Sequence, residues 1–278
     1  MRTWLITGAS RGFGELIAKK ALAAGDAVIA TARKTDGMAE RFGNPPNLLP
    51  VQLDVTSEQQ AHQAVAEGIK RFGRIDILVN NAGYGLLGAV EEASKEEIEP
   101  LFATNVFGVL AVTRAVLPHM RRQRSGHVIN ISSIGGYEAY YGWGVYGATK
   151  FAVEGLSEAL HQELQPLGIH VTVVEPGFFR TDFLDASSLV TSGNQITDYA
   201  DTVGVMRNVA SNLSHAQPGN PAKLADAFLT LANAQNPPLR LPLGSDTVAR
   251  IEQKNRSVAA ELDQWRDLAL STDFVQAA

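Results

Sequence analysis

The sequence predicts an α/β protein with a single-domain Rossmann fold, in which helices cover both faces of a doubly wound, seven-stranded parallel sheet. Short runs rich in Val, Ile and Leu alternate with longer helical patterns along the chain. Such alternation is typical of parallel strands joined by right-handed helical crossovers. The short runs are almost continuously apolar, which indicates strands that are buried on both faces.

Seven strands and five main helices are expected in alternation. The predicted strands are Thr3–Thr7, Ala27–Thr31, Leu48–Leu53, Ile75–Asn80, Gly126–Ile131, His170–Val174 and Leu239–Leu243. The predicted helices are about Gly12–Ala24, Ser57–Phe72, Lys95–Met120, Val145–Leu167 and Pro221–Ala234. Ser57 with Gln60, and Ser94 with Glu97, have the spacing of capping boxes, which mark helix starts.

Two segments are less regular. Residues 178–219 are rich in Ser, Thr, Asn and Asp, with a weak helical pattern at about 198–213. A long insertion of this kind is often a lid, which we place at about 183–219. Residues 1–244 then form the dinucleotide-binding and catalytic domain. Residues 245–278 form a polar helical extension of that domain, expected to pack on the body or on another subunit.

Composition excludes several classes of protein and site. The absence of cysteine excludes disulfides, thiolate chemistry and cysteine-based zinc sites. A net charge of -5 gives no reason to expect nucleic acid binding. No signal peptide is evident, and no stretch approaches the ~18 apolar residues that cross a bilayer. None of the six histidines has a convincing metal-ligand spacing, so we expect no catalytic metal. We expect a cytoplasmic protein without a membrane partner.

A glycine-rich loop, Thr7–Gly14, follows the first strand and opens the first helix. Glycines allow a tight turn and close approach of a pyrophosphate, and the helix N-terminus offers free N–H groups to its oxygens. A plain strand-to-helix turn also fits these glycines. The second strand leads to Arg33, where folds that bind NAD usually have an acidic residue. Arg33 and Arg11 converging on a 2′-phosphate favour NADP, although both also fit as solvated surface cations.

Tyr146 and Lys150 are four residues apart at the start of a predicted helix, so they share one face. A nearby ammonium lowers the pKa of a phenol, which makes the pair suitable for proton transfer. Ser133, after the fifth strand, is expected to face Tyr146, with Ser132 as an alternative that should point to the opposite side. Asn105 lies mid-helix among apolar neighbours, so we expect a buried amide that needs hydrogen-bond partners. These are either a water that bridges to Lys150 or groups of a purely structural contact.

These motifs resemble the short-chain dehydrogenase/reductase family over about Arg2–Gly244, in its NADP-preferring branch with hydroxysteroid and retinol-type dehydrogenases and carbonyl reductases. The further matching segments are Leu53-Asp54-Val55, Asn80-Asn81-Ala82-Gly83, and Pro176-Gly177 with Thr181. The resemblance implies NADP(H) as cofactor and a catalytic tetrad of Asn105, Ser133, Tyr146 and Lys150. It also implies a proton relay from Tyr146 through the ribose and Lys150 to a water near Asn105. The implied cofactor-binding residues are Gly8, Ser10, Arg11, Gly12, Phe13, Gly14, Arg33, Asp54, Val55, Asn81, Ala82, Gly83, Tyr146, Lys150, Pro176, Gly177, Phe179 and Thr181.

The expected function is hydride transfer between nicotinamide and a hydrophobic ketone, aldehyde or secondary alcohol, with Tyr146 as general acid or base. The substrate is expected to contact Ser133, Tyr84, Tyr140, Trp143, Phe178 and Phe183. The alternatives are a catalytically silent regulator that senses NADP, and an epimerase or dehydratase that retains its cofactor. The long extension departs from the family's usual short tail, and we expect a homo-oligomer, either a dimer or a tetramer.

Overall fold

The computed structural model describes residues 1–274, and seven parallel strands form its central sheet in the order β3-β2-β1-β4-β6-β7-β9. The strands are β1 Thr3–Ile6, β2 Ala27–Ala32, β3 Leu48–Gln52, β4 Ile77–Asn80, β6 Gly126–Ile131, β7 Ile169–Pro176 and β9 Arg240–Leu243. All seven lie within the predicted runs or within one or two residues of them. The predicted fold class is therefore confirmed.

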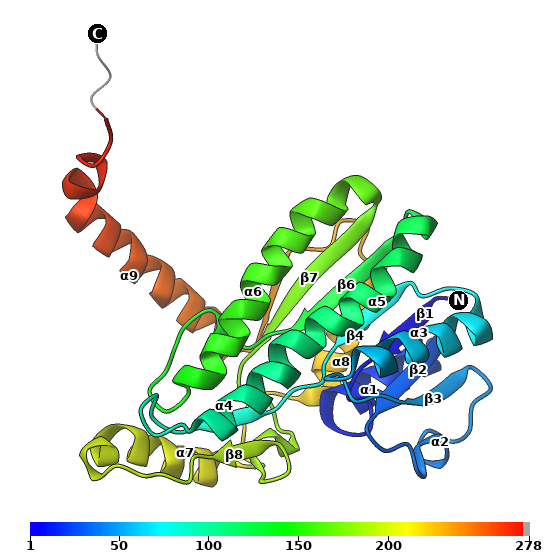
Figure 1. Cartoon of the computed structure of the whole chain (residues 1–278), viewed down its shortest axis with the longest axis horizontal. Helices are drawn as coiled ribbons and strands as arrows, with labels where there is room; N and C mark the ends of the chain where they lie inside the picture. The colour runs from blue at the N-terminus through cyan, green and yellow to red at the C-terminus, as the bar shows by residue number, and fades with distance from the viewer. Residues whose placement is uncertain (275–278) are drawn as a thin grey trace.

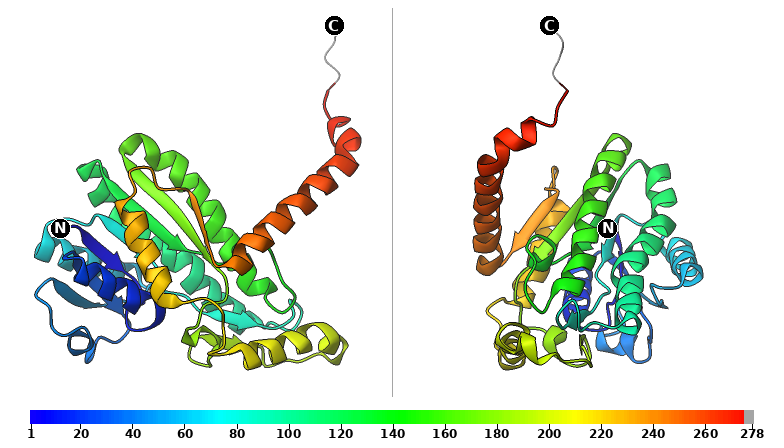
Figure 2. Two further views of the ribbon diagram at one scale, coloured as in Figure 1. Left: turned by 180° about the vertical axis from the view of Figure 1, so that it is seen from behind. Right: turned by 60° about the vertical axis from the view of Figure 1, so that its left-hand side comes forward.

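Helices cover both faces of the sheet (Figures 1 and 2). On one face, α1 (Gly12–Ala23) and α8 (Pro221–Asn233) enclose a core that includes Trp4, Val28 and Phe228. On the other face, α3 (Glu58–Phe72), α5 (Gly108–Gln123) and α6 (Gly144–Leu164) pack around a second core. The short α2 spans Met38–Arg41 and α4 spans Lys95–Phe102. Continuous apolar strands are required here because each strand contributes side chains to both cores.

One of the two predicted capping boxes is confirmed and the other is half formed. Ser94 accepts a hydrogen bond from the N–H of Glu97, whose carboxylate accepts the N–H of Ser94 in return. Ser57 accepts the N–H of Gln60, but the Gln60 side chain accepts the N–H of Asp54 instead. The Ser57 N–H bonds the carbonyl of Asp54, which leaves the glutamine free to bind elsewhere.

The helical run Lys95–Gln123 contains α4, a π-helical segment at Ala103–Phe107, and α5. By length and composition this run is apolar enough to cross a membrane, contrary to the expectation that no such stretch exists. It is a core helix of the fold, because Val112 and Val116 are fully buried in the second core. The apolar composition therefore reflects packing on the sheet.

The lid contains more structure than its sequence predicts. Strand β8 (Leu189–Thr191) pairs in parallel with β5 (Gly85–Leu87), which follows β4, to form a small second sheet. The predicted weak helix consists of a 3₁₀ turn, a π segment and α7 (Val205–Leu213). Strands of three residues are too short to give a periodic pattern, so the second sheet could not be predicted.

The C-terminal extension is one long helix, α9 (Ser245–Leu270), which projects away from the body (Figure 1). Among the described residues, the first part of α9 contacts the body and the second part is exposed, so the expectation that the extension packs on the body holds for the first part. The last residues of the predicted extension, 275–278, lie outside the described residues.

Candidate active site

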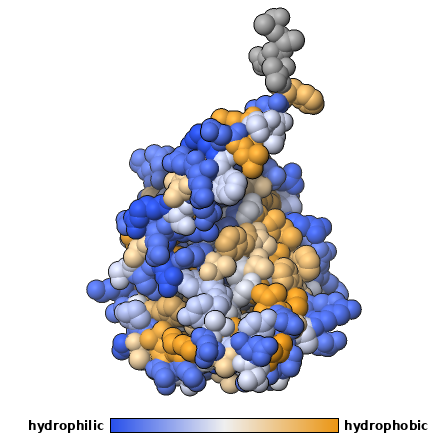
Figure 3. Space-filling model, turned by 90° about the vertical axis from the view of Figure 1, so that its left-hand side faces the viewer, coloured by the Kyte–Doolittle hydropathy of each residue, from blue (hydrophilic) through white to orange (hydrophobic). Residues whose placement is uncertain are grey.

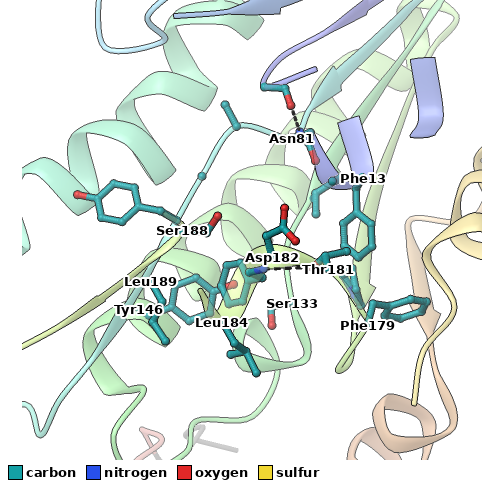
Figure 4. A pocket seen from close by; sticks show the side chains of 18 of the residues that line it. Phe13, Asn81, Ser133, Tyr146, Phe179, Thr181, Asp182, Leu184, Ser188 and Leu189 are labelled. Atoms are coloured by element: carbon teal, nitrogen blue, oxygen red, sulfur yellow. Dashed lines mark hydrogen bonds between the residues drawn. The ribbon is translucent and has the colours of Figure 1, made fainter. Parts of the chain in front are cut away.

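A cavity of about 730 Å³ lies along the carboxyl ends of the strands, where parallel α/β sheets bind their ligands. Its walls combine the glycine loop, the ends of β2, β4, β6 and β7, the lid, and one residue of α9. Figure 4 shows Ser133 and Tyr146 among these side chains, together with Phe13 and Phe179. Of the predicted site residues, all but Gly14 and Asn105 line this cavity.

The glycine loop has the geometry of a phosphate cradle. Gly8 and Gly12 have φ angles of 64° and 59°, which side-chain-bearing residues rarely adopt. A Cβ on Gly14 would lie 2.5 Å from the Gly8 carbonyl oxygen, whereas a Cβ on Gly12 would meet nothing within 4 Å. Gly14 therefore closes the turn and Gly12 borders open space. Helix α1 begins at this point without a side-chain cap, so its free N–H groups suit a pyrophosphate.

Thr7 and Asn81 hold the loop against the end of β4. The Thr7 hydroxyl accepts the N–H groups of Asn81 and Ala82 at 2.9 and 3.0 Å. The Asn81 side chain donates to the carbonyl oxygens of Thr7 and Gly8 at 2.8 and 3.1 Å. These contacts explain why the Asn-Asn-Ala-Gly segment accompanies the glycine loop, and they fix the cradle before any ligand binds.

Two cations border the cavity near the end of β2. Arg33 is exposed there, and its charge acts on both Asp54 and Tyr84. Hydrogen bonds from Thr56, aided by Arg33, keep the pKa of Asp54 below its ordinary value despite partial burial. The sequence predicted that Arg11 and Arg33 converge on a 2′-phosphate. In this structure the Arg11 guanidinium donates to the hydroxyl and the carbonyl oxygen of Ser187 in the lid.

A third cation was missed by the sequence analysis. Arg41, in α2, donates to the carbonyl oxygen of Ser10 at 3.0 Å, inside the glycine loop. An arginine on a four-residue helix has no local signal, since only the fold places it beside residue 10. The end of the cavity near β2 thus has Arg33 on its wall and Arg41 close to the glycine loop, both exposed to solvent.

Tyr146, Ser133 and Lys150 meet below the carboxyl end of β6. Burial raises the pKa of the Tyr146 phenol, and the neighbouring Ser133 hydroxyl partly offsets the rise. Lys150 Nζ lies 5.8 Å from the Tyr146 ring centroid and donates to the carbonyl oxygen of Ile131 at 2.9 Å. Burial lowers the pKa of Lys150 to about 8, and the carboxylate of Glu154 opposes that shift. The three side chains therefore lie together at the cavity wall.

Asn105 lies in the π-helical segment, fully buried behind the cavity wall. Its side-chain oxygen accepts the N–H of Tyr84, and its side-chain nitrogen donates to the Tyr84 carbonyl and to the Thr149 hydroxyl. The side chain thus makes structural contacts with Tyr84 and Thr149, and the water bridge toward Lys150 stays a prediction. A Cβ on Gly83 would lie 3.0 Å from Asn105 Oδ1 and 3.8 Å from Lys150 Nζ, so glycine is required between them.

Ser132 is buried, and its side chain lies beside Glu154 in a buried cluster of charges. This cluster contains Glu154 of α6, Glu175 of β7 and Arg240 of β9, whose Nε lies 3.4 Å from Glu154 and 3.5 Å from Glu175. Burial and the neighbouring Glu154 raise the pKa of Glu175 to about 7, and burial also raises the pKa of Glu154. Glu158 also pairs with Arg240, so three carboxylates share one guanidinium here. Its positive charge therefore only partly offsets the effect of burial on Glu154 and Glu175.

Replacing Glu175 with Gln is expected to make thermal stability less dependent on pH. A carboxyl with a raised pKa stabilises the fold at low pH, and this stability is lost as the pH rises through about 7. The wild-type Tm should therefore fall relative to the variant's Tm between pH 5 and 8, measured by thermal unfolding at fixed ionic strength. The exposed Glu163→Gln serves as the control, and parallel Tm curves for wild type and E175Q contradict the prediction.

Aromatic side chains form the wall opposite the glycine loop. Trp143 packs edge-on against Tyr146 with ring centroids 5.7 Å apart, and Phe183 of the lid stacks on Trp143 at 6.4 Å. The other predicted substrate residues, Tyr84, Tyr140 and Phe178, also line the cavity. So does Arg250, which lies over the Tyr140 ring at 4.7 Å and was missed because it belongs to the extension. This end of the cavity is apolar with one cation at its edge.

The lid is anchored by a buried carboxylate. Glu92, 2% exposed, accepts the N–H groups of Ala89 and Ile196 at 2.7 and 2.8 Å and pairs with Arg207 of α7. These bonds keep the pKa of Glu92 low despite its burial. Together with the β5–β8 pairing, this anchor holds the lid over the aromatic wall. Sequence reasoning missed Glu92, because its lid partners, Ile196 and Arg207, are more than a hundred residues away.

The fold also brings together a histidine and two carboxylates that the sequence separates. His215 Nε2 lies 3.1 Å from Asp185, and a ligand atom of Asp182 lies within 4.8 Å of both. The Ser214 hydroxyl donates to Asp185, and this bond is the main reason that the pKa of Asp185 is lowered. The spacing of these residues in the sequence did not indicate that they would meet. The cluster is largely exposed and its groups already bond one another within the lid.

Comparisons with known proteins agree with this geometry. Residues 2–189 match the family model described as short chain dehydrogenase. A 3-ketodihydrosphingosine reductase of Bacteroides thetaiotaomicron is 42% identical over 241 residues, 86% of this chain and 87% of that protein. The structure of a short-chain dehydrogenase from Streptomyces avermitilis is 42% identical with a TM-score of 0.91, covering 98% of this chain and 100% of that one. ElxO with NADP bound is 28% identical with a TM-score of 0.74, covering 89% and 99%.

Proposed function

The chain belongs to the short-chain dehydrogenase family of oxidoreductases, and on that premise we propose that it is an NADP(H)-dependent reductase of hydrophobic ketones or aldehydes. The observation that carries the proposal is the meeting of Ser133, Tyr146 and Lys150 at the junction of a phosphate cradle and an aromatic pocket. The reverse reaction, oxidation of a secondary alcohol, uses the same groups.

The residues of the cavity fit a dinucleotide. The uncapped N-terminus of α1 and the open space at Gly12 suit the pyrophosphate, and Asp54 and Val55 border the adenosine end. Pro176, Gly177 and Thr181 lie at the other end, beside the catalytic tyrosine. Arg33 stands where an acidic residue would select NAD, which favours the 2′-phosphate of NADP. ElxO, with NADP bound, is consistent with this choice.

The chain's own residues account for orientation and proton transfer. Bound nicotinamide supplies or accepts the hydride. The hydroxyls of Ser133 and Tyr146 hydrogen-bond the carbonyl oxygen, and Tyr146 gives it a proton as the carbonyl becomes an alcohol. The positive charge of Lys150 favours the phenolate that remains, and a proton from solvent restores the phenol. Asn105 keeps Tyr84 and Thr149 in place behind this group.

The proposed substrate class follows from the aromatic wall. Trp143, Phe183 and Tyr84 offer a largely apolar surface next to Tyr146, which suits a hydrophobic carbonyl compound. The relative from Bacteroides thetaiotaomicron is named as a reductase of a 3-keto compound. That name supports the direction and the functional group of the proposal.

The proposal is tested by NADPH consumption, followed as loss of absorbance, with a panel of hydrophobic ketones and aldehydes and with NADH in parallel. Net oxidation of NADPH by at least one compound, well above the rate with NADH, is the expected result. Two alternatives predict otherwise. A silent regulator binds NADPH without turnover, and an epimerase or dehydratase converts its substrate without net loss of NADPH. Either finding would replace the proposed function.

A further inference from the structure

Helix α9 has two halves with different surroundings. In its first half, Thr247 is fully buried, Arg250 packs on Tyr140, and the Tyr137 hydroxyl donates to Asn255 at 2.6 Å. From Arg256 to Leu270 every residue is exposed, and among the described residues its hydrogen bonds and ion pairs join only α9 and the turn that follows it. Figure 2 shows this second half extending clear of the sheet and its helices.

The exposed half still carries an apolar stripe. Val258, Leu262 and Trp265 are 46%, 53% and 58% exposed, and their spacing of four and three residues puts them on one helix face. Toward the start of α9 the same spacing leads through Asn255 to Ile251 and Thr247, which face the body. One face of α9 is therefore covered by the body at its start and exposed at its end. On the projecting part, hydrophobic residues lie at the surface among hydrophilic ones (Figure 3). We call Val258, Leu262 and Trp265 the α9 stripe.

The charges of α9 distinguish between the possible partners of this stripe. The helix has four basic and five acidic residues, a net charge of -1, with both signs along its length. Helices that bind anionic membranes are rich in Lys and Arg on their polar face, so a membrane is disfavoured. A nearly neutral helix with mixed signs does not repel its own copy. Spacing of four and three residues is also the pattern of helix pairs with interlocking side chains.

We propose that the α9 stripe binds the α9 stripe of a second copy of this chain, with the two helices antiparallel. In such a pair, centred near Ala260, Val258 of one copy faces Leu262 of the other, and Asn255 lies near Trp265. Glu252 then lies opposite Arg266 of the second copy, and the two-fold axis repeats this complementary pair. A parallel pair is disfavoured, because the same face of α9 meets the body at its start and the two bodies would collide.

The test is the mass of the purified full-length protein in solution, measured by light scattering during size-exclusion chromatography. The double variant Leu262→Glu/Trp265→Glu is expected to have half the wild-type mass or less. Ala260→Glu, with the same kind of change on the opposite face of α9, should keep the wild-type mass. A monomeric wild type, or a double variant with the wild-type mass, overturns the proposal.

A cross-link provides a second readout that does not depend on the stability of α9. The natural chain contains no cysteine, so a single introduced cysteine can form a disulfide only between two copies. Ala259 lies on the stripe side at the proposed two-fold axis, and Ala260 points away from it. Ala259→Cys should form covalent dimers under mild oxidation much faster than Ala260→Cys. Equal rates for the two variants would contradict the antiparallel pairing.

Discussion

Replacing Tyr146 with Phe is expected to lower turnover by about 100-fold to 10,000-fold, the usual contribution of a positioned general acid. The change removes only the hydroxyl, so the ring still packs between Trp143 and Phe183. NADPH binding should therefore stay within about two-fold of wild type, since the phenol is one of many contacts along the cavity. Steady-state turnover and NADPH titration by fluorescence measure the two quantities separately.

A matched control is available in the neighbouring Tyr141, which is 57% exposed and outside the cavity lining. Tyr141→Phe removes the same hydroxyl five residues earlier and should leave turnover unchanged. Wild-type turnover in Tyr146→Phe would exclude Tyr146 as the acid. An equal loss in both variants would indicate a general effect of the substitution on this segment.

Replacing Arg33 with Ala is expected to weaken NADPH binding by about 10-fold to 150-fold and to leave NADH binding nearly unchanged. A hydrogen bond to a charged group contributes roughly 1.5–3 kcal/mol, which corresponds to that range. NADH lacks the 2′-phosphate, so it has no such bond to lose. The dissociation constants of both cofactors, measured at one ionic strength, give the change in preference.

Lys34 provides the control for this prediction. It is the next residue, equally exposed and equally charged, but it does not line the cavity. Lys34→Ala should change NADPH affinity only slightly, through long-range charge. If Arg33→Ala binds NADPH with the same affinity as the wild type does, and likewise NADH, then Arg33 is a solvated surface cation. In that case Arg41 and Arg11 become the residues to test next.

The main framework could be predicted because it depends on local patterns. Each strand of the sheet is a continuous apolar run, and the glycine loop lies at the first strand-to-helix junction, so fold and cofactor region follow from sequence. The relation of Tyr146 to Lys150 depends only on helical spacing. Predicting that Ser133 rather than Ser132 faces Tyr146 required one further argument, the alternation of side chains along β6. Predictions of this kind need only neighbours in the chain.

The features that were missed depend on contacts between distant segments. Arg250 reaches the cavity from an extension whose path has no local signal. Glu92 is held by Ile196 and Arg207 of the lid, and Glu175 acquires its raised pKa from burial and from Glu154 on another element. Arg11 was expected beside Arg33, but Ser187 lies within reach of its guanidinium once the lid is in place. None of these neighbours can be identified from spacing.

One contact at the start of α9 limits how the chain can be shortened. Asp246 accepts the N–H of Phe178 at 2.8 Å, and its carboxylate fills the space that a Cβ on Gly177 would occupy. The first turn of the extension thus completes the loop that follows β7. Removing the extension at Gly244 leaves that loop N–H without its acceptor and opens the wall beside Thr181. A trimmed protein must retain this turn, and loss of activity on deletion of residues 245–278 cannot by itself be attributed to lost self-association.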